Sequence, residues 1–176
     1  FQSPEDGFDH QSTMPEFPAP EVVEDDRARL RALFADTPDL AARWSHEEPI
    51  ELRSVTPANL RTPSPLPAHH AVWFRASRDL GDDMALNQCL LAYASDYSLL
   101  GTAMRPHGVS WMSGVQTASL DHILWFHRPT NFSRWHLYVQ DSPSASGARG
   151  FNLGSIYRQD GVLVASAAQE GLIRRR

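Results

Sequence analysis

The chain has 176 residues, 41% hydrophobic and 21% charged, enough for one globular domain with a core and some peripheral segments. The formal net charge is -5 and the only basic run is the last three residues, which argues against a nucleic-acid surface because phosphate binding needs a concentrated basic patch. Cys89 is the only cysteine, which excludes a disulfide framework or a multi-cysteine zinc site within one chain and favours a reducing compartment.

The N-terminal quarter is predicted to lie outside the main folded unit. Residues 1–20 carry four prolines and little hydrophobic periodicity, which is typical of an extended connector. Residues 21–48 are predicted to form a helical linker. An amphipathic helix is expected over about Glu21–Ala35, with acidic residues early and arginines later, and a short helix from Pro38 to about Trp44.

Residues 49–176 are predicted to form the folded domain. Two strands come first, over Ile50–Val55 and Ala71–Ala76, and a long apolar helix follows over about Ala85–Met104. Polar residues interrupt this helix, so no membrane span is expected. The order of elements indicates an α+β fold, in which an antiparallel sheet needs the helix to cover its apolar face. Four strand-like runs complete the domain: Ala118–His127, Trp135–Asp141, Phe151–Arg158 and Val162–Ile173.

Asp96 is the only charged residue of the long helix. On a helical wheel it shares a stripe with Cys89, Tyr93 and Leu99, so its side chain is expected to face the core. A carboxylate there is costly unless it is hydrogen-bonded, and such groups are often catalytic acids or bases. A structural aspartate satisfied by neighbouring groups is the alternative. The stripe expected to face solvent contains Asn87, Leu91, Ser95, Ser98 and Thr102.

Two polar side chains on strands are further candidates. Gln169 is predicted to share the core face of the last strand with Leu163 and Ala167, where an unsatisfied amide costs about 1–3 kcal/mol. It therefore either has a function or bonds to a neighbouring strand. Ser119 lies near the start of the Ala118–His127 strand and, taken alone, is as readily an ordinary strand serine.

Five residues suggest a metal site but do not support one. Strand alternation puts His122 on the face opposite Asp121 and His127, so the three do not converge. His69 and His70 follow a proline-rich loop and are expected to be a solvated pair. No metal site is therefore predicted. The Gly-x-Ser-x-Gly turn of serine hydrolases and a phosphate-binding glycine loop are also missing from the sequence.

Four segments together resemble the acyl-CoA thioesterase II family: LLAYASDYSLL, QTASLDHILWFHRP, SPSASGARG and DGVLVASAAQEGLIR. They follow one another in the family's order, and the likeness covers most of residues 71–173. Proteins of this family consist of two fused hotdog domains, each an antiparallel sheet wrapped around one long central helix. The resemblance implies that residues 1–20 are the end of a first hotdog domain with its connector, and that residues 49–176 are the second.

In that family an aspartate, a threonine or serine, and a glutamine hold the water molecule that attacks a thioester. Motif by motif, these positions fall on Asp96, Ser119 and Gln169. The resemblance thus implies an enzyme that hydrolyses fatty acyl-CoA to a fatty acid and coenzyme A with directly activated water and no cofactor. Arg128 and Arg149 are candidates for binding the nucleotide phosphates, or else they brace the sheet.

The register of Ser119 is in tension with this role. Ser119 shares its strand face with Asp121 and Trp125, whereas Leu120 and Leu124 form the more apolar face. Either the Ser119 face meets a partner domain, or a β-bulge re-aims the hydroxyl toward the core.

Two other functions stay open. A hotdog hydratase acting on enoyl-CoA would, by family analogy, carry an Asp–His pair at the helix, and no histidine occurs between Asp96 and Pro106. A non-catalytic hotdog domain that binds acyl-CoA or assembles with others is the second. Hotdog domains of this family pair side by side, so we expect pairing with a first domain or a second chain, as in a homo-oligomer. The absence of a Ser-Lys-Leu-type C-terminus favours the cytoplasm.

Overall fold

The computed structural model describes residues 5–175, so the start of the predicted connector and the last of the three terminal arginines lie outside the described residues. Within that range, no helix is long and apolar enough to cross a membrane. The elements in chain order are η1 (Pro20–Val22), α1 (Asp26–Leu33), α2 (Pro38–Ala41), η2 (Ala42–Trp44), β1 (Ile50–Ser54), β2 (His69–Ala76), α3 (Met84–Met104), η3 (Arg105–His107), β3 (Val115–Ser119), β4 (Ile123–Phe126), β5 (His136–Ser146), β6 (Arg149–Arg158) and β7 (Leu163–Arg175).

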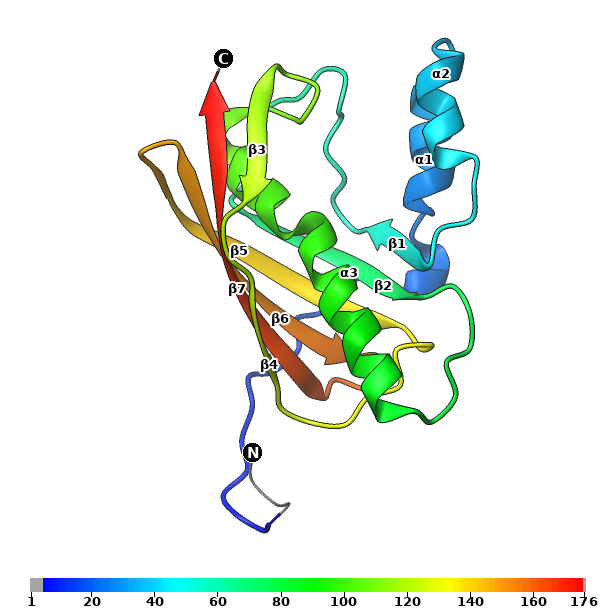
Figure 1. Ribbon diagram of the computed structural model, residues 1–176, viewed down its shortest axis with the longest axis vertical. Coiled ribbons are helices and arrows are strands. Elements are labelled where there is room, and N and C mark those ends of the chain that lie inside the picture. The colour runs from blue at the N-terminus through cyan, green and yellow to red at the C-terminus, as the bar shows by residue number, and fades with distance from the viewer. Residues whose placement is uncertain (1–4, 176) are drawn as a thin grey trace.

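One antiparallel sheet holds all seven strands, in the order β1-β2-β5-β6-β7-β3, and β4 also pairs with β7. The sheet curls around α3, which runs along its concave face, while α1 and α2 lie beyond β1 (Figure 1). Sheet and helix bury one core between them, as expected of two packed layers. The predicted α+β fold, an antiparallel sheet wrapped around one long helix, is confirmed.

The segment before α1 is extended and follows the sheet instead of leaving it. The Gln11 amide donates to Gly161 O at 2.8 Å and accepts from Leu163 N at 3.0 Å. Trp73 Nε1 donates to Pro18 O at 2.9 Å. A second small apolar cluster therefore covers part of the convex face, formed by Met14, Phe17, Val23, Ala71, Trp73, Trp135 and Leu137.

The face of α3 that meets the sheet is only partly the one predicted, since Leu99 of the expected core stripe is fully buried. The stripe expected to face solvent is buried, with Asn87, Ser95 and Thr102 at most 1% exposed. Asp96 and Cys89, expected to face the core, are exposed. The prediction of a sequestered carboxylate is therefore wrong for this chain.

The reason for the error is that the sheet and a loop supply polar partners for the helix. Asn87 Oδ1 accepts from Phe132 N at 2.6 Å, and the Thr102 hydroxyl donates to Gln140 Oε1 at 2.9 Å. Side chains whose hydrogen bonds are satisfied can be buried without the usual penalty. A hydrophobicity pattern read from the helix alone contains no information about these partners.

One predicted strand is also wrong. The run Ala118–His127 is two strands, β3 and β4, because residues 120–122 leave the regular ladder with β7. The other predicted strands are present with shifted ends, and β5 continues as far as Ser146. The predicted helix Glu21–Ala35 is a 3₁₀ turn followed by α1, which begins after the Asp25 cap.

Glycines in β6 allow close packing against α3 at Gly150 and against the neighbouring strand β5 at Gly154. A Cβ atom added to Gly150 would lie 2.4 Å from Ala103 Cβ in α3, and one added to Gly154 would lie 2.3 Å from the Tyr138 ring. Tyr138 is fully buried, and its hydroxyl donates to Ser95 O at 3.1 Å. These positions have no room for a side chain, because interiors are as densely packed as organic crystals.

We expect Gly154→Ala to lower the free energy of unfolding by about 1–3 kcal/mol, because the new methyl group displaces the rigid Tyr138 ring. Chemical denaturation measures the change. Gly101→Ala is the matched control, since a Cβ there meets nothing within 4 Å and alanine favours a helix by about 0.5–1 kcal/mol. A Gly154 variant as stable as the control would contradict the close approach.

His136 is a buried histidine held by two hydrogen bonds. Its Nδ1 is 2.8 Å from Arg134 O, which can only accept, so Nδ1 carries the hydrogen and Nε2 accepts from the Thr130 hydroxyl. Burial lowers the pKa of His136 to about 4, from an ordinary value of 6.5.

This shift predicts a loss of stability in acid. Between pH 6.5 and 4 the unfolded chain binds a proton at His136 that the folded protein does not bind, so the free energy of unfolding falls as pH decreases. His136→Phe removes this contribution. We expect the wild-type protein to lose about 2 kcal/mol more than the variant between pH 7 and pH 5 in denaturant titrations. Parallel pH dependences would show that His136 is not the source.

Candidate active site

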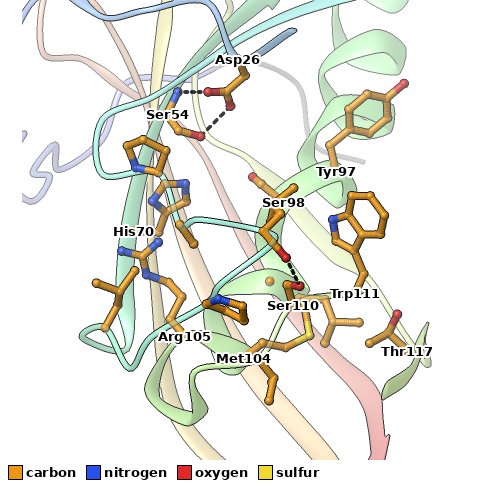
Figure 2. A pocket seen from close by; sticks show the side chains of 18 of the residues that line it. Asp26, Ser54, His70, Tyr97, Ser98, Met104, Arg105, Ser110, Trp111 and Thr117 are labelled. Carbon is orange, nitrogen blue, oxygen red and sulfur yellow. Dashed lines mark hydrogen bonds between the residues drawn. The ribbon is translucent and has the colours of Figure 1, made fainter. Parts of the chain in front are cut away.

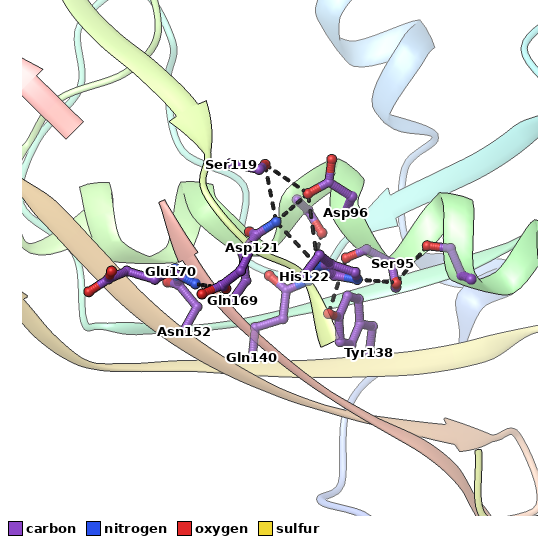
Figure 3. A network of polar contacts seen from close by, with 12 residues as sticks. Ser95, Asp96, Ser119, Asp121, His122, Tyr138, Gln140, Asn152, Gln169 and Glu170 are labelled. Carbon is purple, nitrogen blue, oxygen red and sulfur yellow. Dashed lines mark hydrogen bonds and ion pairs between the residues drawn. The ribbon is translucent and has the colours of Figure 1, made fainter. Parts of the chain in front are cut away.

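Three side chains singled out from the sequence meet at one carboxylate oxygen (Figure 3). Ser119 Oγ donates to Asp96 Oδ1 at 3.0 Å, and Gln169 Nε2 donates to the same oxygen. Gln169 Nε2 also donates to Ser119 Oγ at 3.1 Å. Asp96 comes from α3, Ser119 from the end of β3 and Gln169 from β7. The cluster therefore forms only when the helix and both strands are in place.

The two oxygens of Asp96 differ in their surroundings. Oδ1 receives both side-chain hydrogen bonds, whereas Oδ2 has no hydrogen-bond partner among residues 5–175. The Asp96 side chain is 49% exposed, while Gln169 is fully buried beneath it. A carboxylate with one oxygen held by hydrogen bonds and the other free can bind a water molecule or another small donor.

A β-bulge joins β3 to β4 and sets the direction of Ser119. Ser119 lies opposite Gly171 and Ile123 opposite Ala168, so four steps along this segment match three along β7. The N–H groups of Leu120 and Asp121 both donate to the carbonyl oxygen of one residue, Glu170, at 2.9 and 3.3 Å. The Asp121 carboxylate also accepts from Glu170 N at 2.7 Å, which fixes the bulge.

The extra residue changes which side chains share a face. Gly171 faces α3, because a Cβ there would lie 2.3 Å from Leu100, so its neighbour Ser119 faces α3 as well. Leu124, opposite the core residue Ala167, also faces inward. In an unbroken strand Ser119 and Leu124 would point to opposite faces. Of the two explanations left open by the sequence, the bulge is confirmed.

His122 is a fourth polar member of the cluster, and sequence reasoning missed it. Its Nε2 lies 2.7 Å from Ser95 Oγ, and its Nδ1 lies 3.2 Å from Gln169 Nε2 and 3.9 Å from Asp96 Oδ1. It escapes a prediction that treats Ala118–His127 as one regular strand. The conflict between the strand register of Ser119 and its expected role was the signal that could have found His122. A bulge that turns Ser119 toward the core lets His122, on the other face of a regular strand, point toward the core as well.

The other histidines and Asp121 do not gather around a metal position. His127 Nε2 is 2.9 Å from Ser166 Oγ, and Asp121 is bonded to the bulge. Of the predicted solvated pair, His69 is exposed as expected, whereas His70 is half-buried in the wall of a cavity. Burial, together with the charge of Arg105, lowers the pKa of His70 to about 3. Within residues 5–175, no three or more His, Cys, Asp or Glu side chains are grouped to hold a metal ion.

A layer of buried amides supports the cluster from the sheet. Gln140, Asn152 and Gln169 are fully buried on the neighbouring strands β5, β6 and β7, beneath α3 (Figure 3). Gln140 is satisfied by the helix, since its Nε2 donates to Ser98 Oγ at 2.6 Å and its Oε1 accepts from Thr102. Asn152 Oδ1 and Gln169 Oε1 are buried without a hydrogen-bond partner among the described residues.

A cavity of about 510 Å³ adjoins Asp96 and Ser119. His70 and Arg105 face Ser98 and Trp111 across it (Figure 2). Much of its wall is apolar, which suits a hydrocarbon chain better than a charged group. The apolar lining includes Leu52, Leu60, Leu66, Leu100, Met104 and Trp111.

Neither predicted phosphate-binding arginine lines this cavity. Arg128 donates to Leu163 O at 2.9 Å and pairs with Asp9, so it ties the N-terminal segment to β7. Arg149 is 54% exposed and lies 3.6 Å from the Glu170 carboxylate. It borders a smaller cavity of about 190 Å³ together with other basic side chains, His107 and Arg175.

Comparison with known proteins gives consistent matches. A family model described as acyl-CoA thioesterase matches residues 46–172. Acyl-CoA thioesterase 2 of Haemophilus influenzae is 40% identical over 99% of this chain and 62% of its own length. Human acyl-coenzyme A thioesterase 8 is 39% identical over 94% of this chain and 54% of its own length. The chain thus spans little more than half to about three-fifths of these relatives.

Solved structures agree with the fold described above. The crystal structure of acyl-CoA thioesterase II TesB2 from Mycobacterium marinum superposes with a TM-score of 0.74 at 37% identity, covering 99% of this chain and 60% of that one. A protein with a hotdog fold from Alicyclobacillus acidocaldarius gives a TM-score of 0.68 at 17% identity, over 99% of this chain and 59% of that one. The curled sheet around α3 is therefore a hotdog fold.

Proposed function

The chain belongs to the acyl-CoA thioesterase family, and we propose that its site hydrolyses fatty acyl-CoA to a free fatty acid and coenzyme A. The observation that carries this proposal is the convergence of Ser119 and Gln169 on one oxygen of Asp96, beside a largely apolar cavity. Thioester hydrolysis needs a base for water and a place for the acyl chain, and this arrangement offers both.

Asp96 acts as the base in this proposal. Oδ1 is held by Ser119 and Gln169, and Oδ2 takes a proton from a water molecule whose oxygen attacks the thioester carbonyl carbon. The tetrahedral adduct then breaks its C–S bond, the electron pair leaves with sulfur, and Asp96 returns the proton to the thiolate. A positioned base of this kind is worth about 10²–10⁴ in rate. No acyl-enzyme and no cofactor take part.

The two cavities suggest where the parts of the substrate bind. The acyl chain occupies the 510 Å³ cavity between α3 and the loop before β2, where Leu66 and Met104 remove its methylene groups from water. Arg149 is the better of the two candidate phosphate contacts, because His107 and Arg175 border the same small cavity. Its contact with Glu170 is long, at 3.6 Å, whereas Arg128 is held by both Asp9 and Leu163 O.

A second hotdog domain completes the site in this proposal, either the first domain of a longer chain or a second copy. β4 is an edge strand, and the large apolar side chains around it are 39–55% exposed. An open, apolar edge of this kind invites pairing with another sheet. A domain placed there would also cover Asp96. We further infer that this assembly works in the cytoplasm. The exposed side chains are Leu120, Ile123, Trp125 and Phe126.

One observation favours a second candidate function, the hydration of enoyl-CoA. The sequence offers no histidine next to Asp96 on the helix, but the bulge brings His122 Nδ1 to 3.9 Å from Asp96 Oδ1. An Asp–His pair of this kind could add water to a double bond. The two reactions are separable in one assay, because hydration consumes an enoyl-CoA without releasing a thiol.

The first prediction of this function concerns the base. Asp96→Asn should lower the rate of thiol release from a fatty acyl-CoA by at least ~100-fold, because the amide cannot accept the proton of water. A thiol-reactive dye follows the reaction, and thermal unfolding checks that the fold is intact. Asp82→Asn, at an exposed carboxylate just before α3, is the control and should keep full activity. Full activity in the Asp96 variant excludes the proposed role.

A second prediction concerns the partner domain. Thiol release per site should be at least ~10-fold faster in a longer chain that includes a preceding hotdog domain than in the 176 residues alone, because closure of the site excludes water around Asp96. Trp125→Glu should reduce both activity and association, since it places a charge on the open edge of β4. Light scattering measures the association as the molar mass in solution. Equal activity of the short and long chains would mean that one domain suffices.

A further inference from the structure

His122 contacts two members of the site but has no part in the reaction described above. Its side chain is 20% exposed and lies between Ser95 on α3 and Gln169 on β7. Both ring nitrogens are within hydrogen-bond distance of a polar atom. What His122 can do depends on which nitrogen carries the hydrogen.

The hydrogens can be assigned by counting donors. The Ser95 hydroxyl has a single hydrogen, and it is directed to Ala92 O at 2.8 Å. The 2.7 Å contact between Ser95 Oγ and His122 Nε2 therefore needs a hydrogen from the ring. A neutral imidazole has one N–H, so Nε2 carries it and Nδ1 keeps a free lone pair. That lone pair accepts from Gln169 Nε2 at 3.2 Å.

This lone pair determines the orientation of the Gln169 amide. In the observed orientation, the two hydrogens of Nε2 are shared among three acceptors, on Asp96, Ser119 and His122, and Oε1 has no partner among residues 5–175. An amide rotated by 180° would place Oε1 against the Asp96 carboxylate and the Nδ1 lone pair. Two of the three groups in front of the amide would then repel it.

We propose that His122 is a positioning residue, whose Nδ1 lone pair fixes the Gln169 amide so that its N–H groups hold Asp96 and Ser119. The inference rests on the proposed hydrolase function and adds a residue to its machinery. The chain of contacts runs from Ala92 O through Ser95 and His122 to Gln169, and so ties β7 to the helix that carries Asp96.

His122 is not itself the base. Its Nε2 donates to Ser95, and its Nδ1 lone pair is occupied by Gln169, so neither nitrogen is free to take a proton from water. The free acceptor of the cluster is Asp96 Oδ2. His122 acts on the reaction only through Gln169.

Two substitutions at His122 distinguish a role in orienting Gln169 from a role in filling space. Asparagine can place its side-chain oxygen where Nδ1 lies, so His122→Asn keeps the acceptor, whereas glutamine reaches the Nε2 position and His122→Gln loses it. In the form of the protein that releases thiol, we expect His122→Asn to keep kcat within about 3-fold of wild type. His122→Gln should lower kcat about 10- to 100-fold with little change in KM, since a misplaced group costs rate more than binding.

A double substitution and a control complete the test. In a Gln169→Ala background, His122→Gln should cause no further fall in kcat, because the group it orients is gone. His127→Gln, at the residue bonded to Ser166, should keep wild-type kcat. Equal losses in the Asn and Gln variants, or a further fall in the Gln169→Ala background, would overturn the positioning role and leave His122 as packing.

The tautomer of His122 is measurable without any activity. Nitrogen-15 NMR should show a hydrogen on Nε2 and none on Nδ1, and a hydrogen on Nδ1 would overturn the proposal. A protein with this tautomer that never releases thiol would instead contradict the hydrolase function alone, so the two failures are distinguishable.

Discussion

The carbonyl oxygen of Glu170 accepts hydrogen bonds from two consecutive N–H groups, those of Leu120 and Asp121. This bulge inserts one residue between β3 and β4, and Asp121 closes it by accepting from the Glu170 N–H. The contacts that Ser119 and His122 make around Asp96 depend on it. Without the extra residue, Ser119 and His122 would lie on opposite faces of one strand, because successive side chains alternate. With it, both point toward α3 from an edge that is still attached to β7.

The cluster is held rigidly because the helix and the sheet beneath it share a polar layer. Gln140 bonds to two hydroxyl groups of α3, and Tyr138 reaches Ser95 O, so the helix cannot rotate about its axis without breaking buried hydrogen bonds. Breaking such bonds is costly in a low-dielectric interior. The close approach of Gly150 to Ala103 and of Gly171 to Leu100 sets the spacing between the sheet and α3. Orientation and distance of Asp96 relative to β7 are therefore both determined by groups outside the site.

Sequence reasoning predicted the fold class, the long helix and most strands, because hydrophobic periodicity and turn residues are local properties. It also selected Asp96, Ser119 and Gln169, through motifs and not through geometry. It failed at the helix face. Asn87 and Thr102 are buried there because they hydrogen-bond to Phe132 and Gln140, which are distant in sequence. It missed His122 because a bulge depends on cross-strand pairing. Both failures concern non-local hydrogen bonds, which a single-chain pattern does not contain.

The exposure of Asp96 links assembly to chemistry. A carboxylate that is 49% exposed is surrounded by water, which competes for Oδ2 and weakens the electrostatic effect of the groups around it. The exposed apolar side chains on the edge strand β4 lie just beyond the bulge, on the same segment that carries Ser119 and His122. A domain that covered this edge would bury apolar surface and at the same time exclude bulk water from the Asp96 carboxylate. On the proposed function, the free energy of association would thus also stabilise a closed, catalytically effective site.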